Sequence, residues 1–271
     1  MHLTFPIRGD KLSMNVEIKE HLAHRKTEFQ TIDIYDTDVF GKVLFLDNHV
    51  QLAELDEHAY HESLVQIPLN SIQFPKRALV VGGGDGGVLR ELVKNEYLEQ
   101  IDMVEIDQGV VELCREHLPA VSNGAFDDPR VTLHIADAFP FLKKVSQPYD
   151  LIVVDSTDTY EGEDGANSEQ LFTETFYQDC RGALSEQGFL VTQADNLLFC
   201  PYSLEAILDT FKRVFPRTGS YQALIPSFGG FSGFAWASKG AKLSQWWTEP
   251  KSVHRYLTPI TFALAFQPLN F

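Results

Sequence analysis

Four carboxylates occupy similar places in this 271-residue sequence. Asp85 lies inside the glycine-rich turn Gly82–Gly87, whereas Glu105, Asp137 and Asp155 each end or closely follow a short apolar run. Apolar runs that alternate with helical patterns predict buried parallel strands, whose carboxyl ends meet at one edge of a sheet, where ligands bind. Because unpaired charges are unfavourable to bury, four acids at one edge indicate a cationic ligand.

The glycine-rich turn narrows the kind of ligand. The apolar run Ala78–Val81 leads into it and a helical pattern follows from Val88, which predicts a strand, a tight turn and a helix. Glycine permits the turn and a close approach of ligand to backbone. Dehydrogenases, flavoproteins and methyltransferases all use such a turn, but Asp85 would repel a pyrophosphate at the helix N-terminus. We therefore expect adenosine carrying a positive group rather than a dinucleotide.

Two further features involve acids at strand ends. Glu105 lies at the end of the second predicted strand, where an acidic residue typically accepts the hydroxyls of an adenosine ribose. Asp155 and Asp158 are three positions apart on a strand end and its loop, and they could hold an alkylammonium between them or form an ordinary turn. Beside Asp85 and Glu105, the binding interpretation is favoured.

Histidines offer a weaker signal. His58 and His61 are three apart on one predicted helix and could share a metal ion, or they could pack or face substrate. No third histidine or cysteine stands near them, so we favour the packed or substrate-facing alternative and expect no metal site. We expect the other seven histidines to form no cluster.

An α/β framework must position these side chains. Residues 73–271 predict a Rossmann-like nucleoside-binding domain with a mostly parallel sheet, and residues 1–72 predict a small antiparallel β-hairpin subdomain that ends in a helix. The predicted strands are 31–35, 42–47, 50–54, 78–81, 101–107, 131–135, 150–155, 189–193, 221–225 and 233–238, and the predicted helices are 55–65, 88–93, 108–117, 138–145, 168–184 and 204–214.

Composition argues against two classes of partner. The net charge of −16 argues against nucleic acid or an anionic membrane and suits a cationic small molecule, although it would also serve solubility alone. Three cysteines without metal-ligand spacing suggest reduced thiols and a cytoplasmic location. We find no signal peptide and no apolar segment of membrane-spanning length.

The sequence resembles the spermidine synthases, which are polyamine aminopropyltransferases. The resemblance runs in unbroken order from about Gln30 to Ser238 and rests on Gly82–Glu91, Val104–Asp107, Asp128–Arg130 and Asp155–Asp158, with Val43–Asp47, Asp56–Glu57, Tyr60–Glu62 and Leu171–Phe172 in support. It implies a β subdomain before a methyltransferase-type Rossmann domain, in homodimers or homotetramers. It also implies transfer of an aminopropyl group from decarboxylated S-adenosylmethionine, a co-substrate, to an amine, which releases methylthioadenosine.

The resemblance further implies roles for single residues. Asp155 would orient and deprotonate the attacking amine, helped by Tyr60. The implied donor site has Asp85 at the aminopropyl ammonium, Glu105 at the ribose and Asp137 at the adenine, and it includes Gln30, Gln51, Gly82 and Gly84. The implied acceptor channel consists of His61, Asp158, Gln193 and Phe228.

Departures from the family pattern fall on the acceptor side. The loop Thr159–Asn167 is longer than in the family, lacks its two prolines and adds acidic residues, and Phe228 replaces a tyrosine. Putrescine is the default acceptor, and spermidine, agmatine and cadaverine are alternatives. Two other function classes stay open. A methyltransferase would explain Glu105 but not Asp85, and a non-catalytic polyamine-binding homologue would explain the altered acceptor side.

Overall fold

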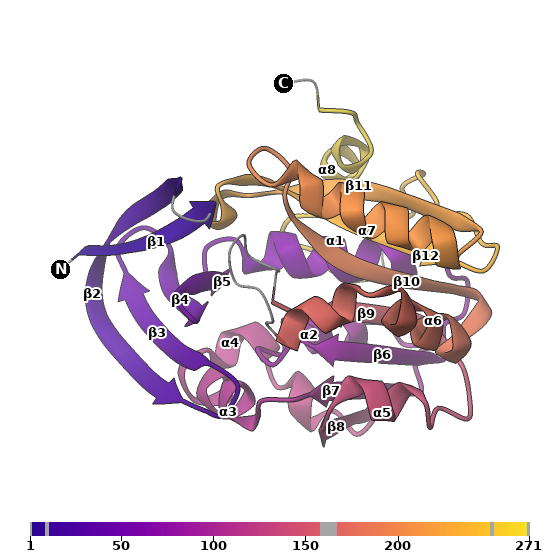
Figure 1. The fold of residues 1–271 in the computed structure, drawn as a ribbon, viewed down its shortest axis with the longest axis horizontal. Helices are drawn as coiled ribbons and strands as arrows, with labels where there is room; N and C mark the ends of the chain where they lie inside the picture. Colours follow the sequence, from indigo (N-terminus) through magenta and orange to yellow (C-terminus); the bar gives the residue numbers. More distant parts are fainter. Residues whose placement is uncertain (1, 9–10, 158–166, 250–251, 270–271) are drawn as a thin grey trace.

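The computed structural model of the chain describes residues 2–8, 11–157, 167–249 and 252–269. The chain forms a small N-terminal sheet, indigo and violet in Figure 1, and then a larger sheet flanked by helices. Among the described residues, no helix has both the length and the apolar character needed to cross a membrane.

The N-terminal sheet confirms the predicted antiparallel β subdomain. Five strands follow one another in space as in sequence, and they are β1 (His2–Arg8), β2 (Leu12–Lys26), β3 (Thr31–Thr37), β4 (Gly41–Leu46) and β5 (His49–Ala53). Ile32 and Leu44 point from this sheet into a core shared with Val110 and Leu113. The last two belong to helix α3 (Gln108–His117), so this helix fixes the N-terminal sheet against the rest of the molecule.

The larger sheet confirms the Rossmann-like prediction. Its strand order is β11-β12-β10-β9-β6-β7-β8. The five strands β10, β9, β6, β7 and β8 run parallel to one another, whereas β12 is antiparallel to both of its neighbours, β10 and β11. The strands are β6 (Arg77–Gly82), β7 (Gln100–Glu105), β8 (Val131–Ile135), β9 (Tyr149–Asp155), β10 (Leu184–Asn196), β11 (Arg217–Ile225) and β12 (Gly230–Ser238). The apolar runs Ala78–Val81 and Leu151–Val154 are buried along their length because helices cover both faces.

Helices divide between the two faces of this sheet. One face packs against α1 (Glu57–Leu69), α2 (Gly87–Val93) and α8 (Pro259–Ala265), and the other against α5 (Ala138–Leu142), α6 (Glu174–Ala183) and α7 (Pro201–Val214). The remaining short helices are α4 (Pro119–Ser122), η1 (Ala125–Asp127), η2 (Asn167–Phe172) and η3 (Pro226–Phe228).

The predicted helix 138–145 ends at Leu142 and the predicted helix 204–214 begins at Pro201, and two other predicted helices differ further from the structure. The predicted helix 168–184 is wrong in its first part, because η2 is a 3₁₀ helix that is separate from α6. Thr173 caps the N-terminus of α6, where its side chain accepts a hydrogen bond from the Phe176 backbone N–H. The predicted helix 55–65 begins at Glu57 and continues to Leu69. This helix packs on α2, so it also belongs to the core of the larger sheet. The domain boundary at residue 72 stays a prediction.

Candidate active site

A cavity of about 540 Å³ opens at the carboxyl edge of the larger sheet, where β4 and β5 of the N-terminal sheet form its opposite wall. This volume suits a nucleoside-sized ligand. Eleven of the thirteen predicted site residues line it, and they are Gln30, Gln51, Tyr60, Gly82, Gly84, Asp85, Glu105, Asp137, Asp155, Gln193 and Phe228. The two others are His61, which lies behind the wall, and Asp158, which lies outside the described residues.

The glycine-rich turn brings β6 and β9 into close contact. Gly82 and Gly83 have φ angles of 80° and 73°, and the Gly83 N–H donates to the Asp155 carbonyl at 2.9 Å. A Cβ atom at Gly82 would lie 2.2 Å from that carbonyl oxygen. Any side chain there would therefore push the turn away from the strand end that carries Asp155.

Asp85 and Asp155 face each other across this contact. Ligand atoms of the two carboxylates and of His61 all lie within 4.8 Å of one another. The Tyr60 hydroxyl donates to Asp155 Oδ1 at 2.6 Å. Burial and the charge of Asp85 raise the pKa of Asp155 to about 6, against the opposing effects of His61 and Tyr60. Asp155 is thus a stronger base than an ordinary aspartate and lies in hydrogen-bond contact with a phenol.

His61, on helix α1, contacts Asp85 from behind the cavity wall and does not itself line the cavity. Its Nε2 lies 3.3 Å from Asp85 Oδ1 and its Nδ1 lies 2.7 Å from Glu57 Oε2, with the ring 2% exposed. Burial disfavours the charged ring, but Asp85 and Glu57 outweigh burial and raise the pKa of His61 to about 10. The implied place in the acceptor channel thus differs from the structure, because α1 passes beneath the turn and presses the ring against Gly87.

The row of buried charges continues away from the cavity. Arg90 donates to both carboxylate oxygens of Glu57 at 2.8 Å. His61 and Arg90 hold the pKa of Glu57 down at about 2, although burial alone would raise it.

The sequence also raised the possibility of a metal ion shared by His58 and His61. Within the described part of the chain, His58 belongs to no group of possible metal ligands, whereas His61 lies in a group with Asp85 and Asp155.

Glu105 and its neighbours form the wall beside β7. Glu105 is buried, and its Oε1 accepts the Asp107 backbone N–H at 2.8 Å. Burial raises the pKa of Glu105 to about 7, and the charges of Asp107 and Asp155 add to this while backbone N–H groups oppose it. Gln30 donates to Asp107 Oδ2 at 2.9 Å, and Asp137 caps α5 by accepting the Phe139 N–H at 2.9 Å.

The opposite end of the cavity is shaped by the end of β10. Gln193 donates to the Ser156 carbonyl at 3.1 Å and accepts the Asp195 N–H at 2.9 Å. Phe228 packs edge-on against Tyr60, with ring centroids 5.8 Å apart. This end therefore combines an apolar ring with fixed polar groups.

Three polar residues at this end escaped the sequence analysis. Asp195 lines the cavity with a φ of 59°, and burial raises the pKa of its carboxyl group against hydrogen bonds from Asn196, Cys200 and Ser203. The hydroxyls of Ser156 and Ser232 are buried in the wall without a hydrogen-bond partner. Asp195 lies where the β10–β12 register shifts, and nothing in the sequence pattern marks this shift.

Known protein families match both the N-terminal part and the larger part of the chain. Residues 57–245 match a family model described as the spermine/spermidine synthase domain, and residues 5–54 match one described as the spermidine synthase tetramerisation domain. The chain is 42% identical to a polyamine aminopropyltransferase of Pectobacterium atrosepticum, over 83% of this chain and 77% of that protein. It is 39% identical to one of Clostridium perfringens, over 88% and 84% respectively.

A solved structure agrees over nearly the whole chain. A spermidine synthase in complex with the transition state analogue AdoDATO superposes with a TM-score of 0.92 and 28% identity, covering 99% of this chain and 92% of the other. The likeness thus extends over both sheets.

Proposed function

This chain belongs to the spermine/spermidine synthase family and is a polyamine aminopropyltransferase, and we propose that its cavity aligns decarboxylated S-adenosylmethionine with an attacking amine. The observation that carries this proposal is the approach of Asp85 and Asp155 at the sheet edge, with Glu105 close by. Acidic groups in this number suit a donor and an acceptor that are both cationic.

We assign the donor to the side formed by the glycine-rich turn and β7. Glu105 would accept the ribose hydroxyls, and Asp137 would contact the adenine at the exposed rim. Asp85 would receive the aminopropyl ammonium, because its carboxylate is fixed by the Gly87 N–H at 2.6 Å. Ordinary S-adenosylmethionine keeps a carboxylate at the corresponding position, which Asp85 would repel. This repulsion would make the site selective for the decarboxylated donor.

Proton removal is the main chemical demand on the enzyme. The donor sulfonium is already a good leaving group. An alkylamine, however, has a pKa near 10.4, so its deprotonation at pH 7 costs roughly 4 kcal/mol of free energy. In the proposed step the amine lone pair forms the C–N bond while the C–S pair returns to sulfur. Asp155, held by Tyr60, aims the amine and takes the proton that the new bond makes acidic.

Putrescine is our proposed acceptor, and the far end of the cavity supports an amine with a second cationic group. The Asp195 carboxylate and the unpartnered Ser156 and Ser232 hydroxyls could bind the distal ammonium. The same groups would also serve spermidine, agmatine or cadaverine. Phe228 removes one hydroxyl from this end compared with the family pattern.

We further propose a homodimer or homotetramer located in the cytoplasm. The match of residues 5–54 to a tetramerisation domain supports assembly. The buried thiols of Cys114, Cys180 and Cys200 form no disulfide, which suits a reducing compartment. Light scattering on the purified protein at several concentrations would give the oligomeric state.

A product assay tests the proposed reaction. Decarboxylated S-adenosylmethionine is supplied with putrescine, cadaverine, agmatine, spermidine and norspermidine in separate reactions, and methylthioadenosine and the aminopropylated amine are measured. We expect the highest kcat/KM with putrescine. A preference for another amine would reassign the acceptor, and methyl transfer from ordinary S-adenosylmethionine would support a methyltransferase. Thermal stabilisation by polyamine with no turnover would support a binding protein.

A further inference from the structure

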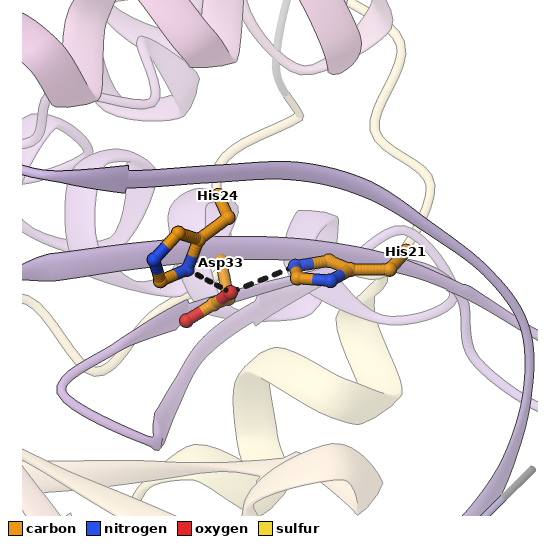
Figure 2. Close-up of side chains that lie close together, drawn as sticks. All are labelled: His21, His24 and Asp33. Atoms are coloured by element: carbon orange, nitrogen blue, oxygen red, sulfur yellow. Dashed lines mark hydrogen bonds and ion pairs between the residues drawn. The ribbon is translucent and has the colours of Figure 1, made fainter.

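Two histidines and one aspartate form a second cluster on the N-terminal sheet, outside the cavity (Figure 2). His21 Nε2 lies 2.7 Å from Asp33 Oδ1, and His24 Nδ1 lies 2.8 Å from the same oxygen. The prediction that these histidines form no cluster is therefore wrong. His21 and His24 come from β2, and Asp33 comes from the neighbouring strand β3.

A β-bulge makes this cluster possible. Residues three apart in a regular strand point to opposite faces of a sheet. In β2, however, His21 pairs with Tyr35 and Ala23 pairs with Ile34, so Leu22 is an extra residue on its strand. The bulge turns His21 to the same face as His24, which lies directly across from Asp33. The two histidines therefore lie on the same face of the sheet because of the bulge.

The three side chains are both accessible and oriented. The side chains of His21 and His24 are 41% and 60% exposed, and that of Asp33 is 16% exposed. Tyr35 stacks on the His21 ring, with centroids 4.3 Å apart and an interplanar angle of 19°. Figure 2 shows the two imidazoles approaching Asp33 from opposite sides. A dissolved ion can therefore reach all three side chains. The contacts with Asp33 and the stacking of Tyr35 on His21 keep the imidazoles oriented.

We propose that His21, His24 and Asp33 bind Zn²⁺. Two imidazoles and one carboxylate form a ligand set that zinc accepts, with water in the fourth position. Zinc–ligand bonds of about 2.0–2.2 Å place tetrahedral ligand atoms roughly 3.3 Å apart. The three ligand atoms lie within 4.8 Å of one another, and the two nitrogen–oxygen contacts need to lengthen by only about half an ångström to admit the ion.

The bound ion would join β2 to β3 at the bulge, where the register of the strands is irregular. Its role would be to fix this pairing, since none of the three residues lines the active-site cavity and the two imidazoles lie open to solvent. The zinc site is independent of aminopropyl transfer.

Calorimetric titration of Zn²⁺ into untagged, chelator-stripped protein tests the proposal. We expect one ion per chain, and His21→Ala, His24→Ala or Asp33→Asn to weaken binding at least about 10-fold. His2→Ala removes an exposed histidine from β1 and is the matched control, which should bind as the wild type does. Co²⁺ should give the intense visible absorption of a tetrahedral site in the wild type but not in His24→Ala.

Three results would overturn the proposal. One is a wild type that binds no zinc. Another is equal affinity in the wild type and all three variants, each shown by circular dichroism to be folded. The third is competition between zinc and methylthioadenosine, because it would place the ion beside Asp85 and Asp155 in the cavity.

Discussion

The described part of the molecule contains two clusters of histidine and aspartate that differ chiefly in their exposure to water. In the first, a carboxylate oxygen of Asp85 lies beside His61, which is 2% exposed. In the second, Asp33 lies between His21 and His24, whose side chains are 41% and 60% exposed. Burial turns the first cluster into a set of fixed charges with shifted pKa values, whereas water screens the second and leaves its ligand atoms accessible.

The two clusters also depend on different backbone features. The glycine-rich turn lets Asp85 approach Asp155 because Gly82 and Gly83 adopt positive φ angles. A bulge brings His21 and His24 to one face of β2. A turn between two core elements fixes the separation of the Asp85 and Asp155 carboxylates, while a bulge in a small sheet places metal-ligand atoms at the protein surface. We thus propose that the same residue types serve catalysis in one place and ion binding in the other.

The largest effect should come from Asp155→Asn. An amide cannot take the proton of the attacking amine, so we expect kcat to fall about 10²–10⁴-fold while donor affinity changes little. Methylthioadenosine formation measures the first quantity, and calorimetric titration with decarboxylated S-adenosylmethionine measures the second. Asp38→Asn, at an exposed carboxylate of the N-terminal sheet region, is the control and should keep wild-type kcat. Turnover near wild type in Asp155→Asn would remove Asp155 from the proton transfer.

The next effect concerns stability. His61→Gln leaves the carboxylate of Asp85, only 13% exposed, without its buried cationic neighbour, so we expect the free energy of unfolding to fall by about 3–5 kcal/mol. His24→Gln in metal-free buffer is the counterpart at the exposed cluster and should change it by less than about 0.5 kcal/mol. Urea unfolding of both variants measures the difference. Equal losses would mean that burial does not distinguish the two clusters.

This stability difference should depend on pH in a defined direction. The pKa of His61 in the folded chain is raised to about 10 from an ordinary 6.5. Its contribution is therefore complete below about pH 6.5 and is lost as pH rises through about 10. The gap between wild type and His61→Gln should narrow over this range. A gap that widens with pH would contradict a protonated His61.

The sequence could predict the first cluster in outline but not the second. Asp85 and Asp155 were predictable because glycine turns and apolar runs locate the carboxyl edge of a parallel sheet from local signals. The position of His61 depends on how α1 crosses beneath the turn, which is a tertiary contact. The pairing of His21 with His24 depends on one extra residue in β2, which has no sequence signature. Local patterns thus located the strand ends, and packing decided which side chains face the cavity.

A smaller effect should separate the two donors. Asp85→Asn removes the charge that we propose to face the donor's ammonium, so affinity for decarboxylated S-adenosylmethionine should fall roughly 10-fold or more. Affinity for ordinary S-adenosylmethionine should stay level or rise, since the repulsion of its carboxylate is gone. Titration of both donors into both proteins measures the ratio. An unchanged ratio would show that selectivity lies elsewhere in the cavity.

The smallest effect should appear in the pH profile of Tyr60→Phe. The Tyr60 hydroxyl donates to Asp155 and stabilises its ionised form, so its loss should raise the pKa of Asp155 further above the present value of about 6. Because only ionised Asp155 can accept a proton, the acidic limb of kcat/KM should move upward by about one pH unit.

Comparing the two proteins with one amine isolates this shift, because the titration of the substrate is common to both profiles. Tyr97→Phe is the matched control, since Tyr97 packs against Phe74 away from the cavity and its variant should keep the wild-type limb. A limb that moves downward in Tyr60→Phe, or equally in both variants, would mean that Tyr60 does not control the basicity of Asp155. An upward shift confined to Tyr60→Phe would show that the single hydrogen bond from Tyr60 sets the pH at which Asp155 becomes an active base.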